Sequence, residues 1–339
     1  MCTLVSNDAV FGAAPCTDSR LAVEVTCSNK AVTVFTYWDF SLIDEGMLDF
    51  IKAANASGRS SIPNLSTPPN WLFVNDDRTY YPDDPLGITG GYEKGVALAD
   101  PSGRAFGDYY GRLVAHYVEG GFTDEAGAWV PGFNLSFSHW EVLNEVNAEH
   151  QLSPPLYTLI YDAVVAGIRR WAPRGSKNMK FVGIGGAGDG YIPYFLNKSN
   201  HAPGTPIDVI SLHHYGGSAT RDGGDGVVPG ADYCAFFAAG AGFIGSLASD
   251  YARIAASDYP DVMIDADEVG VILPDDDDPK WTADEPGFPS LYWNAAAAQF
   301  AYLFGMGAGI GLDVLGMSQV SGVAAAPHVS SMCHYCVQQ

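Results

Sequence analysis

The stretch HWEVLNEVN, residues 139–147, decides the fold that this sequence predicts. It begins as an apolar and aromatic run containing Trp140, Val142 and Leu143, and it ends abruptly in Asn144 and Glu145. Short apolar runs of this kind are typical of buried strands in a parallel sheet. The sequence therefore predicts a buried strand that presents an amide and a carboxylate at its end.

A second run of the same design, VMIDADE, occupies residues 262–268. In a β/α barrel the reactive groups lie at the carboxyl ends of the strands. Two carboxylates in such places, Glu145 and Glu268, suggest cleavage of a glycosidic bond. We expect Glu145 to be the general acid/base, with a pKa raised by its surroundings, and Glu268 to be the nucleophile. The alternatives are a salt-bridged loop carboxylate for Glu145 and the partner of a buried arginine for Glu268.

Two aspartates compete with Glu268 for the second role. Side chains alternate along a strand, which puts Asp265 and Asp267 on one face and Glu268 on the other. Only one of these sets can then point into a barrel. We favour Glu268, because the same parity points Ala266 inward and leaves space for a substrate.

Around these two runs the chain alternates apolar strands with helical patterns, which is the rhythm of a parallel α/β fold. The strand patterns cover 31–37, 60–65, a run ending at 141–145, 179–184, 207–213, 261–271 and 309–316. The helical patterns cover 40–54, 106–118, 156–171, 233–256 and 291–304. We predict a (β/α)8 TIM-type barrel over residues 31–322, between an irregular segment, 1–30, and an irregular tail, 323–339. The first barrel strand has no convincing counterpart.

The composition limits the partners of the chain. The 339 residues include 39 acidic and 17 basic side chains, for a net charge of −22. Nucleic acids and anionic membranes need clustered Lys and Arg, so we expect neither as a partner. No stretch approaches the ~20 apolar residues of a membrane span. The oligomeric state stays open.

The localisation also stays open. Sequons at Asn55, Asn64, Asn134 and Asn197 would permit glycosylation in a secretory compartment, which would suit an extracellular protein. The first residues, however, show neither the basic region nor the continuous apolar region of a signal peptide.

Further polar and aromatic residues are candidates for substrate binding. His213, His214 and Tyr215 end a predicted strand. Adjacent histidines point to opposite sides of a strand and do not easily ligate one ion, so we expect no metal site and no cofactor. Flat aromatic side chains suit stacking on a sugar, although each could equally be ordinary core; the candidates are Trp38, Trp71, Tyr80 and Tyr81. The run Gly185-Gly186-Ala187-Gly188 lacks the Lys and Ser/Thr of a P-loop and is interpreted as a tight turn.

The chain resembles a clan A glycoside hydrolase and is most similar to family 39, the group of β-xylosidases and α-L-iduronidases. The similar segments lie within residues 30–320 and read TYWDFSLIDEGMLDFIKAA, IPNLSTPPNWLF, HWEVLNEVN, VISLHHYG, VMIDADEVGV and LYWNAAAAQFAYLF. The resemblance implies a retaining enzyme with Glu145 as acid/base after the fourth strand and Glu268 as nucleophile after the seventh. It also implies Asn144 as a ligand of a substrate hydroxyl, and His214 or Tyr215 as subsite residues.

Two other functions remain as alternatives. The first is a non-catalytic or inactive barrel that binds carbohydrate. The second is a metal-dependent barrel hydrolase. Activity on aryl glycosides distinguishes the first from a glycosidase, and sensitivity to a chelator distinguishes the second.

Overall fold

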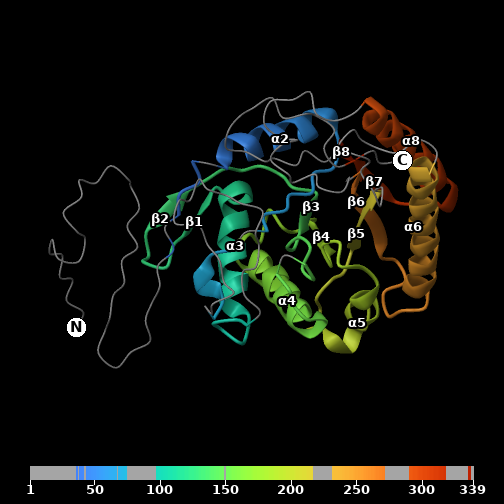
Figure 1. Cartoon of the computed structure of the whole chain (residues 1–339). Coiled ribbons are helices and arrows are strands. Elements are labelled where there is room, and N and C mark those ends of the chain that lie inside the picture. The colour runs from blue at the N-terminus through green and yellow to red at the C-terminus, as the bar shows by residue number, and fades with distance from the viewer. Residues whose placement is uncertain are drawn as a thin grey trace, which may run out of the picture.

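A curled parallel sheet lies at the centre of the computed structural model (Figure 1). The structure describes residues 36, 38–41, 43–66, 68–74, 97–148, 150–216, 231–271, 290–317 and 335–336. The strands are β1 (Gly121–Thr123), β2 (Trp129–Pro131), β3 (His139–Glu141), β4 (Lys180–Gly183), β5 (Val209–Gly216), β6 (Met263–Val271), β7 (Val314–Met317) and β8 (Tyr335–Cys336). The main sheet has the order β3-β4-β5-β6-β7-β8. Its pairs are parallel from β3 to β7, and β8 is antiparallel to β7.

Helices surround this sheet on its outer side. They are α2 (Asp44–Ser57), α3 (Arg104–Val118), α4 (Pro154–Trp171), α5 (Ile192–Phe195), α6 (Ala231–Ala255) and α8 (Ser290–Ile310), with the short 3₁₀ turns η1 (Asn70–Leu72), η2 (Gly188–Gly190) and η3 (Lys198–Asn200). In Figure 1, α3 and α4 lie beside β3 and β4, and α6 and α8 lie beside β6 and β7. The described helices between β3 and β4, between β5 and β6 and between β6 and β7 therefore lie outside the sheet, as in a β/α barrel.

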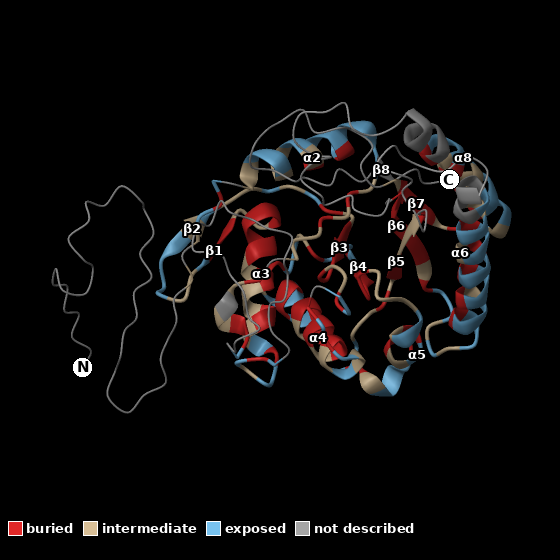
Figure 2. Cartoon of the chain, viewed as in Figure 1, coloured by how far each residue is buried: buried red, intermediate tan, exposed pale blue. Residues whose placement is uncertain are grey.

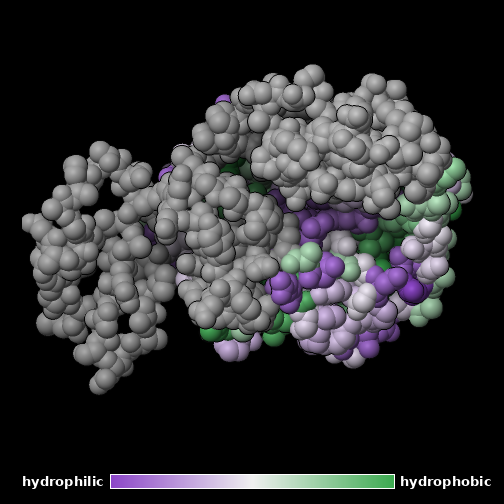
Figure 3. All heavy atoms as spheres, viewed as in Figure 1, coloured by the Kyte–Doolittle hydropathy of each residue, from purple (hydrophilic) through white to green (hydrophobic). Residues whose placement is uncertain are grey.

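Burial follows this arrangement. The strands of the main sheet and the inner faces of α3 and α4 are buried, whereas α6 exposes much of its outer face (Figure 2). In the space-filling view, the edge over α6 is mostly pale green and white, because alanine and glycine dominate that helix (Figure 3). No helix in the described ranges is both long enough and apolar enough to cross a membrane.

The chain at 61–64 runs beside β3 as a parallel neighbour. His139 donates its backbone N–H to the Ser61 carbonyl at 3.1 Å, and Glu141 donates to the Pro63 carbonyl at 3.1 Å. Asn64 forms an isolated parallel bridge with Glu141. The predicted strand at 60–65 is thus reduced to one bridge. The Pro63 carbonyl faces β3, and an N–H at this residue would face β3 as well, so proline removes a hydrogen bond of this pairing.

Close backbone contact joins α3 to α4. A Cβ at Gly107 would lie 2.2 Å from the carbonyl oxygen of Ala163, and a Cβ at Gly111 would lie 2.5 Å from that of Gly167. No side chain fits in these positions, so the glycines set the distance between the two helices. This packing holds α4 against the sheet, directly behind β3 and β4.

Several expected boundaries differ from the structure. The strand that carries the first glutamate ends at Glu141, so Glu145 lies in the following loop rather than at the strand terminus. The expected strand at 309–316 is wrong in its first half, because α8 continues to Ile310 and the strand begins at Val314. Five parallel strands form a half-barrel, and no closed eight-stranded barrel is formed by the residues that the structure describes. The predicted strand at 31–37 lies almost wholly outside those residues.

Candidate active site

A β-bulge between β5 and β6 determines which side chains face the interior. Ser211 of β5 pairs with Asp265 of β6, and His213 pairs with Glu268. The chain thus advances by two residues in β5 and by three in β6. The extra residue in β6 interrupts the alternation of side chains. Asp265 and Glu268 therefore both lie beside residues of β5 that share one face. The expectation that strand parity separates Asp265 from Glu268 is wrong, because parity holds only in a regular strand.

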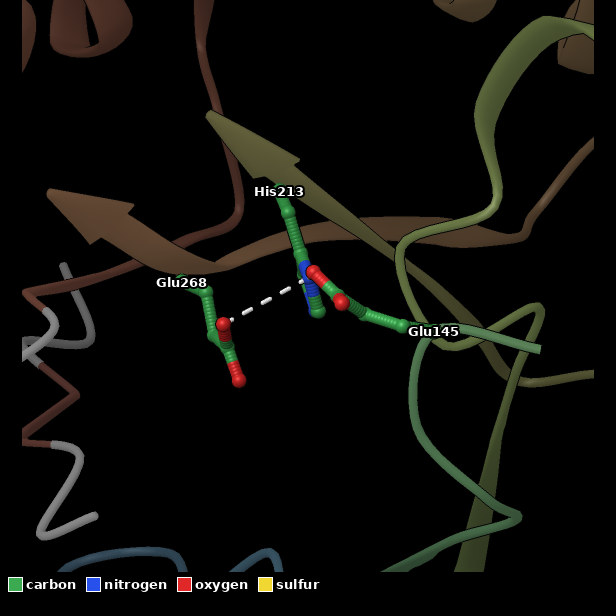
Figure 4. A group of neighbouring side chains, drawn as sticks. All are labelled: Glu145, His213 and Glu268. Carbon is green, nitrogen blue, oxygen red and sulfur yellow. Dashed lines mark hydrogen bonds and ion pairs between the residues drawn. The ribbon is translucent and has the colours of Figure 1, made fainter. Parts of the chain in front are cut away.

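His213 lies between the two glutamates singled out in the sequence (Figure 4). Its Nδ1 lies 3.1 Å from Oε1 of Glu145 and 3.5 Å from Oε2 of Glu268. One atom from each of the three side chains lies within 4.8 Å of the others. Glu145 comes from the loop after β3 and Glu268 from β6, so the fold brings together two carboxylates that are far apart in the sequence.

Tyr215 completes this group from the next inward position of β5. Its hydroxyl donates a hydrogen bond of 2.7 Å to Oε2 of Glu268. Glu268 is 4% exposed, whereas the Glu145 side chain is 35% exposed. One carboxylate is therefore held rigidly in the wall of the site, and the other is open to solvent.

The loop that carries Glu145 has an unusual backbone. Leu143 has φ 63° and Glu145 has φ 37°, and non-glycine residues rarely adopt positive φ. Surrounding contacts hold this conformation: Asn144 donates its N–H to Ser66 Oγ at 2.8 Å, and Asn64 donates its side-chain amide to the Leu143 carbonyl at 3.3 Å. Strain of this kind, held in place by neighbours, is common at functional sites.

The protonation of Glu145 differs from the expected one. The hydrogen bond from His213 lowers the pKa of Glu145, and it outweighs the opposing effect of burial. Trp140, from which this desolvation was expected, is fully buried and packs against the rings of Phe137 and Tyr110. The expected rise in the Glu145 pKa is therefore wrong.

His213 shows the complementary shift. Burial of the ring opposes its ionisation, but the hydrogen bond to Glu145 and the negative charges of Glu268 and Glu141 raise the pKa of His213. The site thus favours an imidazolium between two carboxylates.

A second group of acids lies beneath this one. Ser211 donates a hydrogen bond of 2.5 Å to Oε1 of Glu141. Asp265 is fully buried, and neither of its carboxyl oxygens has a hydrogen-bond partner in the described part of the chain. Burial and the nearby charge of Glu141 raise the pKa of Asp265 to about 8. The folded protein therefore holds a proton here that the unfolded chain would release near pH 3.8.

Asp265 should make the protein less stable as the pH rises. Its folded pKa is raised, so its favourable contribution is complete below the unfolded pKa and is lost between about pH 4 and pH 8. We expect Asp265→Asn to gain stability relative to the parent across this window, by on the order of a few kcal/mol at 1.36 kcal/mol per pKa unit. Urea unfolding of both proteins from pH 4 to pH 8 measures the difference. If the free energy of unfolding changes with pH in the same way for both proteins, the expectation is wrong.

The Gly-rich turn after β4 packs against the ring of His213. Gly185 and Gly186 have φ values of 45° and 74°, which agrees with the interpretation as a tight turn. A Cβ at Gly186 would lie 2.5 Å from Cγ and Nδ1 of His213. The absent side chain at Gly186 thus leaves room for the imidazole ring.

Gly186→Ala should displace His213. The new methyl group overlaps the ring, and the backbone strain adds to the cost, for a loss of about 2–4 kcal/mol. Gly188→Ala is the matched control, because Gly188 has φ 70° but nothing within 4 Å of its Cβ position. Urea unfolding of both variants separates the clash from the strain, and NMR titration of His213 should show a lowered pKa only in Gly186→Ala. Equal losses of stability in the two variants would mean that the new methyl group does not clash with the His213 ring.

The other predicted site residues lie in different places. His214 stacks on Phe243 at 4.6 Å, and its Nε2 lies 3.3 Å from the amide nitrogen of Gln299, on the opposite face of β5. Alternation along the strand places His213, not His214, beside the glutamates. The role of His214 in a subsite stays a prediction. The signal was present in the sequence, because His213 and Tyr215 are two residues apart and so share a face.

The two tryptophans lie around α3. Trp38 stacks on Tyr109 at 5.2 Å and donates its indole N–H to Glu125 at 3.1 Å. Trp71 contacts the same Tyr109 edge-on at 6.2 Å. None of these contacts joins either tryptophan to Glu145 or Glu268, and their substrate-stacking role stays a prediction. Tyr80 and Tyr81 lie outside the described residues.

A metal ion is the other possible occupant of this group. Within the described ranges, one ligand atom from each of Glu145, His213 and Glu268 lies close enough to the others to hold an ion. The Nδ1 of His213, however, is engaged by Glu145 in a hydrogen bond. This arrangement suits proton transfer between side chains, and a chelator experiment distinguishes the two uses.

Comparison with known proteins finds likeness only among solved structures. No family model and no curated protein matches the sequence. A GH51 arabinofuranosidase from Xanthomonas axonopodis pv. citri matches over 62% of this chain and 44% of its own, at 11% identity and a TM-score of 0.46. A GH39 β-xylosidase from Caulobacter crescentus matches over 70% and 42%, at 17% identity and a TM-score of 0.35. A glucosidase from Croceicoccus marinus matches over 51% and 31%, at 19% identity and a TM-score of 0.33.

These structural neighbours are glycoside hydrolases by name, and the aligned part is less than half of the length of each. Likenesses of this size do not identify a family or an activity. What this chain does must therefore be argued from its own side chains.

Proposed function

We propose that the chain is a retaining O-glycoside hydrolase in which Glu145 is the acid/base and Glu268 is the nucleophile. The observation that carries the proposal is the convergence of these two carboxylates on His213, with one atom of each side chain within 4.8 Å of the others. Retaining enzymes place their two carboxyl groups about 5–5.5 Å apart, whereas inverting enzymes need about 6.5–9.5 Å to admit a water molecule. The short separation supports direct attack on the sugar.

The contacts of each glutamate suit its proposed role. Glu268 is buried and is held by the hydroxyl of Tyr215, so an oxygen can be aimed at the anomeric carbon. Glu145 is partly exposed and exchanges a hydrogen bond with an imidazole, so it can give a proton to the leaving oxygen and later take one from water. Asn144, next to Glu145 in the strained loop, is assigned to a hydroxyl of the substrate.

The proposal includes the architecture and the family. The segment at 61–64 and the five parallel strands occupy adjacent positions of a barrel wall, which supports a (β/α)8-type barrel that is incomplete at its N-terminal strand. The assignment to family 39 rests on the resemblance of the sequence. In that arrangement β3 is the fourth barrel strand and β6 the seventh. A glycoside or an oligosaccharide is the substrate, and Tyr215 lines the subsite of the cleaved sugar.

A panel of aryl glycosides, covering both anomers of common pyranosides and furanosides, tests the function. We expect turnover of at least one member, with retention of configuration in the first product seen by proton NMR. A chelator should leave the rate unchanged. Binding of sugars without turnover would instead support the non-catalytic barrel, and loss of activity with the chelator would support the metal-dependent one.

A further inference from the structure

Two buried polar atoms face each other on the side of His213 away from Glu145. The Nε2 of His213 and Oδ1 of Asp267 lie 3.5 Å apart, in side chains that are 7% and 11% exposed. Neither atom has a hydrogen-bond partner in the described part of the chain. Buried polar atoms are nearly always paired, and 3.5 Å is only slightly longer than an ordinary N–H···O bond. A small rotation of either side chain joins them.

We propose that Asp267 is a positioning residue: by engaging Nε2 of His213, it keeps a hydrogen atom on Nδ1, directed at the Glu145 oxygen. The inference rests on the proposed function, in which Glu145 transfers the proton. It assigns to Asp267 a role distinct from that of the neighbouring Glu268.

The two nitrogens of an imidazole ring explain why one contact controls the other. In a neutral ring, one nitrogen donates a hydrogen bond and the other accepts one, and both donate in the cation. If Asp267 is protonated, as its buried position and raised pKa favour, its hydroxyl donates to Nε2 and the hydrogen stays on Nδ1. If Asp267 is ionised, it accepts from Nε2, and the ring is a cation that still carries hydrogen on Nδ1. Both arrangements direct Nδ1–H at Glu145.

Without Asp267, the neutral ring is free to carry its hydrogen on Nε2. Nδ1 would then present a lone pair to Oε1 of Glu145 at 3.1 Å and to Oε2 of Glu268 at 3.5 Å. The charged or titratable groups around the ring come from β3, from the loop after it and from β6, and all are acids: Glu141, Glu145, Asp265, Asp267 and Glu268. No other cation among the described residues contacts the ring. The positions of the hydrogen atoms on the ring therefore determine whether it donates a hydrogen bond to these carboxylates.

The test compares Asp267→Leu, which removes the contact, with Asp267→Asn, whose amide can still donate to Nε2. Ring-nitrogen NMR of histidine-labelled protein reports which nitrogen carries the hydrogen, and His213→Gln identifies the signal of His213. We expect the parent and Asp267→Asn to keep hydrogen on Nδ1. In Asp267→Leu, we expect the Nε2–H form to appear once the ring is neutral. Asp267→Ala replaces the leucine variant if that protein does not fold.

Kinetics give the second measurement. For a glycoside with a poor leaving group, we expect Asp267→Leu to move the falling limb of the pH profile of kcat/KM to higher pH, because loss of Nδ1–H removes the hydrogen bond that lowers the Glu145 pKa. At pH values above the parent limb, kcat/KM should therefore rise by about 3- to 10-fold. The kcat/KM of activated substrates, which need no proton from Glu145, should change by less than about threefold. Asp267→Asn should keep the parent limb. A purely structural role would lower kcat/KM for both kinds of substrate together and leave the limb in place.

Asp162→Asn is the matched control, because Asp162 also binds a buried histidine, His201, at 2.7 Å but lies on α4. It should lower thermal stability and leave the pH profile unchanged. The proposal is overturned if Asp267→Leu keeps both the Nδ1–H form and the parent pH profile, or if Asp267→Asn moves the limb as far as Asp267→Leu does. If no glycoside is turned over, the proposed function fails, and the ring-nitrogen spectra still decide the role of Asp267.

Discussion

Glu268→Ala should abolish turnover of every glycoside that the parent cleaves, by on the order of 10⁴- to 10⁶-fold, the scale of losing a covalent nucleophile. The side chain is 6% exposed, and Tyr215 donates a hydrogen bond of 2.7 Å to one of its oxygens, so the carboxylate is held in the wall of the site. Removal of the carboxylate also leaves a space on the face from which the sugar is attacked.

Azide added to Glu268→Ala should restore cleavage of activated substrates. The small anion occupies the vacated space and attacks the anomeric carbon, so the product is a glycosyl azide of inverted configuration. Proton NMR of that product is the decisive measurement. Glu119→Ala is the control, because Glu119 is a largely buried carboxylate that binds Arg174 and Gly175, far from His213 in the fold. A variant at Glu268 that retains near-parent activity on a poor leaving group would refute the assignment.

Glu145→Ala should separate substrates by their leaving groups. A poor leaving group needs a proton in the transition state, and general acid catalysis is worth about 10²- to 10⁴-fold, so its kcat/KM should fall by this factor. A good leaving group needs no proton, and its kcat/KM should change little. A plot of log kcat/KM against the pKa of the leaving group should therefore be much steeper for the variant than for the parent.

The pH dependence gives a further check on Glu145. Because His213 lowers the pKa of Glu145, the protonated carboxyl that acts as the acid is favoured only at low pH. For poor leaving groups, the parent kcat/KM should fall as the pH rises through that pKa, and Glu145→Ala should lose this limb. His213→Gln should move the limb to higher pH, since it removes the hydrogen bond that lowers the pKa. Equal slopes for parent and Glu145→Ala in the leaving-group plot would assign the proton to another residue.

Much of the fold can be predicted from local sequence patterns. The helices α3 and α4 lie within two residues of their predicted limits, because an apolar stripe at helical spacing and prolines or glycines at the ends involve only neighbours in the chain. The apolar runs at β4, β5 and β6 were likewise correct in position and in their parallel pairing. The segment at 60–65 was overestimated, because Pro63 lacks an N–H for the pairing with β3.

The site itself was predicted in part. The sequence by itself determined that Glu145 follows a buried strand and that Glu268 lies in another strand of the same parallel sheet, because short apolar runs ending in polar residues are a local signal. It also determined that His213 and Tyr215 share one face of their strand. Only the tertiary structure decided that this face lies beside the glutamates, that β6 carries a bulge, and that the Glu145 pKa is lowered rather than raised. These properties depend on pairs such as Glu145 with His213, 68 residues apart, and Tyr215 with Glu268, 53 residues apart. Strand register and electrostatic environment arise from such long-range contacts, whereas periodicity reflects only the neighbours of each residue along the chain.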